Sequence, residues 1–130
     1  MGLTVADIMQ RCVHTIHCQN SILEAEDLLA RNRISGAPMV SSDGQVLGVV
    51  SVTDVTRFRH ENVDADPADR PVFEIGTPIT ITVDANATLR DVARQMTCNQ
   101  VHRLVVVSAG VPVGIVSALD LVARMATGGA

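Results

Sequence analysis

The chain has 130 residues, of which 47% are hydrophobic, and it contains two phenylalanines but no tryptophan or tyrosine. This length is that of one compact domain, and the composition requires an aliphatic core. The formal net charge of −4 at pH 7 argues against nucleic acid or an acidic membrane surface as a partner, because both require a basic field.

No apolar run approaches the roughly 20 residues of a membrane span. The N-terminus lacks the basic start and the apolar middle of a secretory signal. The three cysteines, Cys12, Cys18 and Cys98, cannot all pair within one chain and are typical of reduced thiols. We therefore expect a cytoplasmic protein.

The first half of the chain predicts a strand, a helix, two further strands and a second helix, in that order. A short extended piece at Val13–Ile16 is followed by a helix that begins with a capping box at Ser21. A strand at Ala37–Val40, a turn and a strand at Val46–Ser51 come next, and a helix follows at Thr53–Arg59.

The second half of the chain predicts the same order of elements. An extended piece at Ile79–Val83 precedes a helix that begins after Thr88. Apolar strands follow at Leu104–Val107 and Val113–Ser117, and the last helix is predicted at Leu119–Met125. Continuous apolar strands of this kind indicate a sheet that helices cover on at least one face.

The two halves are copies of each other. A shift of 67 residues places Val5 on Val72 and Ser41 on Ser108. After one dropped residue, a shift of 66 aligns Gly48 with Gly114, Ser51 with Ser117 and Asp54 with Asp120. Matches that persist across both halves with a single gap indicate an internal repeat.

We therefore predict an α/β (α+β) protein of two β-α-β-β-α repeats, at residues 1–59 and 72–126. The segment 60–71 between them is polar, acidic and contains two prolines, which is typical of a linker. Because repeats of this size are marginally stable alone, we expect them to pack face to face around a pseudo-two-fold axis.

The repeated motif carries a resemblance to a known family. It reads Gly48-Val-Val-Ser51-Val-Thr-Asp54 in the first half and Gly114-Ile-Val-Ser117-Ala-Leu-Asp120 in the second. With the order of elements, it makes the chain from Val5 to Met125 resemble a tandem pair of CBS (cystathionine beta-synthase) domains, a Bateman module. The resemblance implies a regulatory, energy-sensing module that binds AMP, ADP or ATP and is not an enzyme.

The pair His102-Arg103 precedes four apolar residues of the second repeat. This stretch is similar to the AMP-binding gamma subunit of the AMP-activated protein kinase, where the two positions face nucleotide phosphate. Arginine offers a planar fork of donors that matches phosphate oxygens, and histidine can donate as well. The counterpart in the first repeat is Ser35-Gly36, so we expect phosphate to be held chiefly by the second repeat.

The Ser-x-x-Asp part of the motif has two compatible interpretations. Serine can cap the following helix while aspartate favours its N-terminus. Alternatively, the carboxylates of Asp54 and Asp120 can accept two hydrogen bonds from a ribose, and the hydroxyls of Ser51 and Ser117 can contact a phosphate. Together with the resemblance, we favour binding roles for both aspartates, because both motifs end a buried strand, and we count the two serines among the candidate site residues.

The resemblance also implies that the adenine lies against apolar walls and main-chain groups of the opposite repeat. For the cleft of Asp120, these residues are Cys12, Val13 and Ser35. For the cleft of Asp54, they are Thr77, Ile79 and Val101.

Other functions are less well supported. The stretch from Cys12 to Cys18 holds two cysteines and two histidines, but its spacing matches no zinc pattern, and we predict no metal site. No cysteine belongs to a recognisable Cys–His–acid arrangement. The main alternative is a pure dimerisation or interaction module without a nucleotide ligand.

The resemblance also implies assembly into a homodimer through helices. The apolar stripes Leu28–Leu29, Val92–Met96 and Val122–Met125 supply more apolar surface than two small half-domains easily hide. We expect a homodimer that acts on an effector protein, which the sequence does not identify.

Overall fold

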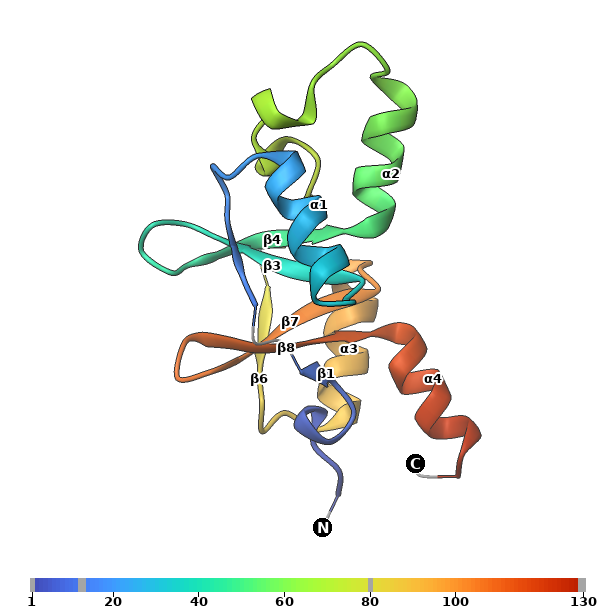
Figure 1. Cartoon of the computed structure of the whole chain (residues 1–130). Coiled ribbons are helices and arrows are strands. Elements are labelled where there is room, and N and C mark those ends of the chain that lie inside the picture. Colours follow the sequence, from blue (N-terminus) through green and yellow to red (C-terminus); the bar gives the residue numbers. More distant parts are fainter. Residues whose placement is uncertain (1, 12–13, 80, 129–130) are drawn as a thin grey trace. The chain divides into compact units, whose positions relative to one another are not determined.

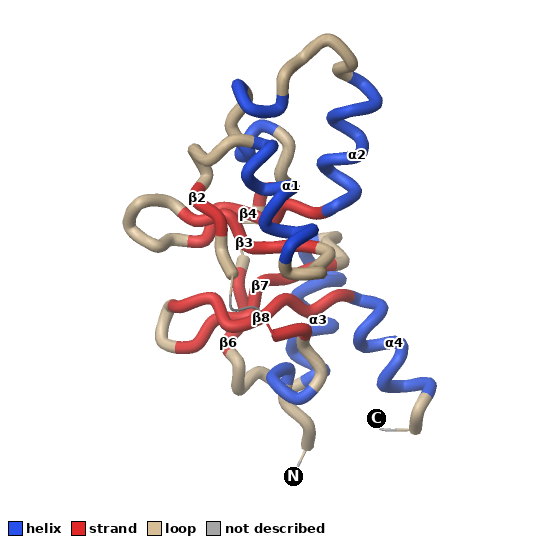
Figure 2. The backbone as a smooth tube through the Cα atoms, viewed as in Figure 1, coloured by secondary structure: helices blue, strands red, loops and turns tan. Residues whose placement is uncertain are grey.

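The computed structural model describes residues 2–11, 14–79 and 81–128. The chain folds as two compact units. We call His14–Thr80 the central unit, and Met1–Val13 together with Ile81–Ala130 the terminal unit. Within the described ranges each unit contains a four-stranded sheet and helices, so the predicted mixed α/β class is confirmed (Figures 1 and 2).

The central unit is a mixed sheet with helices on one face. Its strands are β2 (Ile16–His17), β3 (Gly36–Val40), β4 (Val46–Ser51) and β5 (Thr77–Pro78), in that order across the sheet. β2 runs parallel to β3, and the other neighbours are antiparallel. Its helices are α1 (Ile22–Arg31) and α2 (Val52–Glu61), and its 3-10 turns are η2 (Pro67–Asp69) and η3 (Val72–Glu74).

The terminal unit repeats this plan. Its strands, in order across the sheet, are β1 (Gln10–Arg11), β8 (Val111–Ser117), β7 (Arg103–Ser108) and β6 (Thr82–Asp84). β6 runs parallel to β7, and the other neighbours are antiparallel. Its helices are α3 (Leu89–Asn99) and α4 (Ala118–Ala126), and the 3-10 turn η1 (Val5–Asp7) precedes β1.

Local signals set the helix starts. Ser21 caps α1, because its hydroxyl accepts a hydrogen bond from Glu24 N at 3.0 Å. The Glu24 carboxylate in turn accepts one from Ser21 N at 2.9 Å, which completes the predicted capping box. Thr88 caps α3 in the same way, through a 3.1 Å bond from Asp91 N.

Each unit has its own core of buried side chains. In the central unit it contains Ile16, Ile22, Ala25, Leu29, Ala37, Met39, Val50, Val55, Phe58 and Val72. In the terminal unit it contains Val5, Val83, Val92, Met96, Leu104, Val106 and Val116. The cores are aliphatic apart from Phe58, as the composition predicts.

Two of the apolar helix stripes are not free for assembly, which corrects the expectation from the sequence. Leu29 of α1 lies in the central core, and Val92 and Met96 of α3 lie in the terminal core. By contrast, Val122 and Met125 of α4 are exposed. Amphipathic spacing identifies an apolar face but does not say what covers it.

The early strand of each repeat differs from the prediction. In place of single strands at Val13–Ile16 and Ile79–Val83, the chain forms the pairs β1 and β2, and β5 and β6. The two members of each pair belong to different sheets. Pairing partners depend on tertiary contacts, so an extended, apolar segment does not reveal where its strand changes sheet.

Because of this change of sheet, the first strand of each repeat belongs to the sheet of the other repeat. β1 pairs with β8 of the second repeat, and β5 pairs with β4 of the first. Residues 2–11 therefore fold with the second repeat, and residues 72–79 fold with the first.

The predicted linker, His60–Pro71, is folded as part of the central unit. α2 continues to Glu61, and η2 occupies Pro67–Asp69. Ile22 N donates to the carbonyl of Arg70 at 2.9 Å, which holds the end of this segment against the start of α1. Among the helices of the described ranges, none has the length and apolar character needed to cross a membrane.

Candidate functional site

In the terminal unit, the second repeat motif lies where β8 meets α4. Ser117 is the last residue of β8 and caps α4, since its hydroxyl accepts a hydrogen bond from Asp120 N at 3.1 Å. Oδ2 of Asp120 accepts one from Ser117 N at 2.7 Å. Within the described ranges the half-buried Asp120 makes no hydrogen bond through Oδ1. One carboxylate oxygen is therefore left for another donor.

The hairpin of β7 and β8 brings the basic pair to the same place. Arg103 lies opposite Ser117 in the antiparallel register, and Ala118 N donates to the carbonyl of His102 at 2.9 Å. Arg103 is half-buried and His102 is exposed. Among the described residues, Arg103 has no carboxylate partner. The register thus places Arg103 next to Ser117, whose helix cap also holds Asp120, at the start of α4.

In the central unit, the first repeat motif has the same backbone geometry. Ser51 caps α2 through a 3.2 Å bond from Asp54 N, and Asp54 Oδ2 accepts from Ser51 N at 2.8 Å. Gly36 lies opposite Ser51, and Val52 N donates to the carbonyl of Ser35 at 2.9 Å. The correspondence of Ser35-Gly36 with His102-Arg103 is confirmed, and this position offers no cation.

The two aspartates differ in their second carboxylate oxygen. The Asp54 side chain is only 6% exposed, and its Oδ1 lies 3.4 Å from Nη1 of Arg57. Arg57 was not among the predicted site residues, although the Asp-x-x-Arg spacing on a helix indicates such a pair. Both oxygens of Asp54 therefore have a partner in the chain.

Arg57 also lines a pocket of about 250 Å³ next to Asp54. Arg70, another lining residue, lies with its guanidinium 5.6 Å from the centre of the Phe58 ring and donates to Glu74 at 2.8 Å. The charged groups of this pocket thus largely satisfy one another.

The remaining predicted adenine contacts are divided between the units. Thr77 pairs with Val49 of β4, and Ile79 N donates to the carbonyl of Leu47 at 3.1 Å, so both share a unit with Asp54. Ser35 belongs to the central unit and Val101 to the terminal unit, so each belongs to the other unit from the aspartate to which it was assigned. Cys12 and Val13 lie outside the described residues.

The histidines and cysteines form no metal centre in the described ranges. His17 is used locally, because Nδ1 accepts from Gln19 N at 3.1 Å and Nε2 lies 3.0 Å from the Ser42 hydroxyl. Cys18 and Cys98 are free thiols.

Solved structures similar to this chain include CBS domain pairs. One is the pair of protein MJ0100 in complex with 5′-methylthioadenosine and S-adenosyl-L-methionine, with a TM-score of 0.75, 26% identity and 98% coverage of both chains. Another is CBSX2 in complex with AMP, with a TM-score of 0.67, 25% identity, and 97% of this chain and 98% of that chain covered.

A comparison of sequences leads to the same family. An uncharacterized protein of Methanocaldococcus jannaschii is 30% identical over 118 residues, which are 91% of this chain but 41% of that protein. The chain thus spans about two fifths of this relative. The CBS domain family model matches residues 5–61 and again residues 72–127. This chain therefore belongs to the CBS domain family and contains a tandem pair of these domains.

Proposed function

We propose that the chain is a non-catalytic regulatory module that binds an adenosine nucleotide. The observation that carries the proposal is the second repeat motif, where Asp120 keeps Oδ1 without a hydrogen bond in the described ranges. Arg103 lies opposite its neighbour Ser117. The complexes of similar CBS pairs with AMP and with adenosyl compounds support this ligand class.

Each residue has a chemical role in this proposal. Asp120 accepts hydrogen bonds from the ribose hydroxyls, because a carboxylate can accept two at once. Arg103 contacts phosphate oxygens with its planar fork, and His102 adds a further donor. Ser117 and the start of α4 hold the phosphate by hydrogen bonds to its oxygens.

We propose the remaining contacts on the resemblance alone. Cys12, Val13 and Ser35 line the adenine at Asp120, and Thr77, Ile79 and Val101 line a second cleft at Asp54. The second cleft with Ser51 is the weaker one, because Arg57 already neutralises Asp54 and no arginine replaces Gly36. The first ligand therefore binds at Asp120.

A phosphorylated ligand such as AMP, ADP or ATP suits this site better than S-adenosylmethionine. Charge-assisted hydrogen bonds from Arg103 require an anionic group, and phosphate offers the matching geometry. The bound state would be read by an effector protein or by a second copy of the chain.

A second candidate function is an interaction module without a physiological nucleotide. The observation that favours it is the exposed apolar face of α4, which contains Leu119, Val122 and Met125. Such a surface is typical of a protein contact. Binding of nucleotide to purified protein distinguishes the two functions.

The test is a thermal shift with AMP, ADP, ATP and S-adenosylmethionine on protein that was unfolded, freed of ligand and refolded. At a concentration a hundred times the dissociation constant, a ligand should stabilise the fold by about 2.7 kcal/mol. The absence of tryptophan and tyrosine makes bound adenine easy to detect by its absorbance. Stabilisation by none of the four compounds would leave the interaction module as the function.

A further inference from the structure

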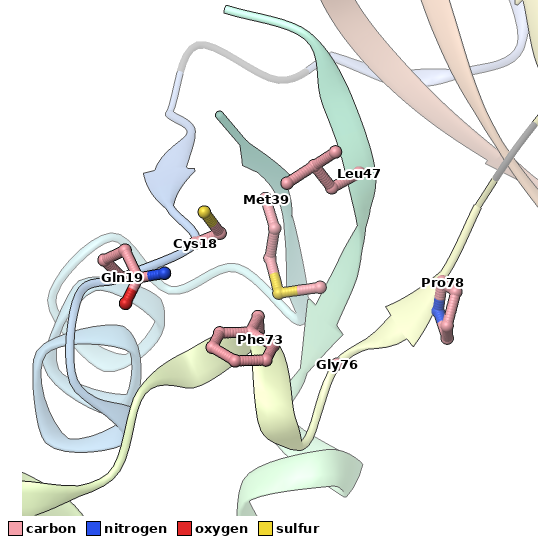
Figure 3. A pocket seen from close by; sticks show the side chains of 7 residues that line it. All are labelled: Cys18, Gln19, Met39, Leu47, Phe73, Gly76 and Pro78. Atoms are coloured by element: carbon pink, nitrogen blue, oxygen red, sulfur yellow. The ribbon is translucent and has the colours of Figure 1, made fainter. Parts of the chain in front are cut away.

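A second pocket, of about 330 Å³, opens on the central unit at its β5 edge. Figure 3 shows the side chain of Met39 in the middle of its lining, with Phe73 and Leu47 to either side. Cys18 and Gln19 close it next to α1, and Pro78 borders it on β5. None of its lining residues belongs to the proposed nucleotide site.

The rim of this pocket is apolar and accessible. Phe73 is 50% exposed, and Leu47 is 39% exposed. The chain has only one other phenylalanine, Phe58, which is buried in the central core. Large exposed apolar side chains around a concave surface are informative, since a folded chain usually hides them.

The floor of the pocket is a fixed part of the fold. Met39 is 2% exposed and belongs to the central core. Its thioether lies against Gly76, where a Cβ atom would clash with both Sδ and Cε of Met39. The missing side chain at Gly76 therefore makes room for Met39 and sets the floor.

The terminal unit supplies an internal comparison. At the positions of Gly76 and Met39 the other repeat has Met9 and Val106, and the sulfur of Met9 lies over Gly114. Both units thus place one methionine against the corresponding glycine of the sheet, Met39 of β3 at Gly48 and Met9, just before β1, at Gly114. Phe73, however, corresponds to Ala6.

Cys18 differs in the same way, because it corresponds to Ala85. The backbone bonds agree with this alignment: Phe73 N donates to the Cys18 carbonyl, and Ala6 N donates to the Ala85 carbonyl. The same backbone hydrogen bond thus forms in the terminal unit with two alanines. The aromatic ring of Phe73 and the thiol of Cys18 therefore have no counterpart at the aligned positions of the terminal unit.

We propose that this pocket binds a small planar aromatic molecule of about two fused rings. A cavity of 150 Å³ is enough for benzene, so the larger pocket has room for a bicyclic ring. Aromatic rings pack favourably on a methionine sulfur and against the edge or face of a phenylalanine. The amide of Gln19 supplies one hydrogen-bonding group for a polar substituent.

The experiment uses 2-naphthol as the probe and the whole chain labelled with 13C at the methionine methyl groups. At concentrations up to about 1 mM, 2-naphthol should shift the methyl resonance of Met39 through its ring current. The methyl resonance of Met9 should stay unchanged. Met39→Leu and Met9→Leu assign the two signals. Cyclohexanol, which lacks a ring current and a π-face, serves as the control compound.

Two variants test the rim. Phe73→Ala, which installs the residue of the other repeat, should weaken 2-naphthol about two- to ten-fold, and Leu47→Ala should weaken it less. Val111→Ala, an exposed apolar residue of the terminal unit, should leave binding unchanged. Equal shifts at Met9 and Met39, no shift at Met39, or unchanged affinity in Phe73→Ala would overturn the proposal. AMP binding plays no part in any of these outcomes.

Discussion

At the scale of single residues, Asp54 and Asp120 make the same contact with the backbone and differ in their other carboxylate oxygen. Each accepts a hydrogen bond from the serine that caps its helix. Oδ1 of Asp54 pairs with Arg57, whereas the residue three positions after Asp120 is Ala123. One motif is therefore neutralised within the chain, and the other has an acceptor to offer a ligand.

Arg103→Ala tests the phosphate assignment directly. Removal of its charge-assisted hydrogen bonds should weaken AMP about ten- to hundred-fold and leave adenosine nearly unchanged. Titration calorimetry with both ligands measures the difference. Arg90→Ala removes an exposed arginine from α3 of the same unit and should change neither affinity.

Asp120→Asn completes this comparison, because it keeps an acceptor for the helix cap and removes the charge. Asp120→Asn should lower the affinity for AMP and for adenosine alike. Asp54→Asn should lower both affinities less. If Arg103→Ala weakened adenosine as much as AMP, the arginine would not be a phosphate ligand.

At the scale of elements, α1 and α2 of the central unit are joined by an ion pair that the terminal unit lacks. Arg59 donates from Nε to Glu26 Oε2 at 2.8 Å and from Nη2 to Oε1 at 2.5 Å. The aligned residues of the terminal unit are Ala93 and Met125. The hydrogen bond from Arg59, more than its charge, lowers the pKa of Glu26, although partial burial opposes the shift.

This ion pair predicts a pH dependence of stability. Because the pKa of Glu26 is lower in the folded chain than in the unfolded one, its contribution is complete above the unfolded pKa. The contribution is lost as the pH falls through the folded pKa. Glu26→Gln should therefore lower the free energy of unfolding slightly at pH 7, and this difference between wild type and variant should be smaller at pH 3.

Urea unfolding at both pH values measures this difference. Glu61→Gln, a change of an exposed glutamate in α2, is the matched control and should show no such decrease. A stability difference for Glu26→Gln that is equal at both pH values would show that the charge of Glu26 does not contribute.

At the scale of the whole molecule, the exposed face of α4 distinguishes the two repeats. Leu119, Val122 and Met125 are 72%, 56% and 68% exposed. The aligned residues of α2 are Thr53, Thr56 and Arg59. An apolar stripe that occurs on one of two equivalent helices indicates a contact made by that helix, and we propose that it pairs with α4 of a second copy.

Sedimentation velocity tests this homodimer. Wild type should sediment as a dimer, and the double variant Leu119→Glu/Val122→Glu should sediment as a monomer, because two charges would be buried without partners. The matched variant Thr53→Glu/Thr56→Glu, on the equivalent face of α2, should remain dimeric. A wild-type monomer at all concentrations would refute the proposal.

Much of the fold follows from signals that lie close together in the sequence. Helices α1 to α4 follow directly after the N-caps Ser21, Ser51, Thr88 and Ser117, as the capping spacings predict. The apolar strands and the tight turns between them also lie close to their predicted ranges. The Ser-x-x-Asp motifs could also be identified from the sequence, because the capping serine and the aspartate carboxylate are only three residues apart.

The strand partners and the composition of the Met39 pocket depend on contacts between segments that are distant in the sequence. The sequence by itself determined the repeat, the helix starts and the alternation of strands and helices, because these depend on interactions over a few residues. The tertiary structure decided that β1 joins β8 and that β5 joins β4, and it brought Phe73 and Cys18 to the Met39 pocket. Two-residue strands carry almost no signal of their own, so their partners are chosen by the edges and side chains that they cover.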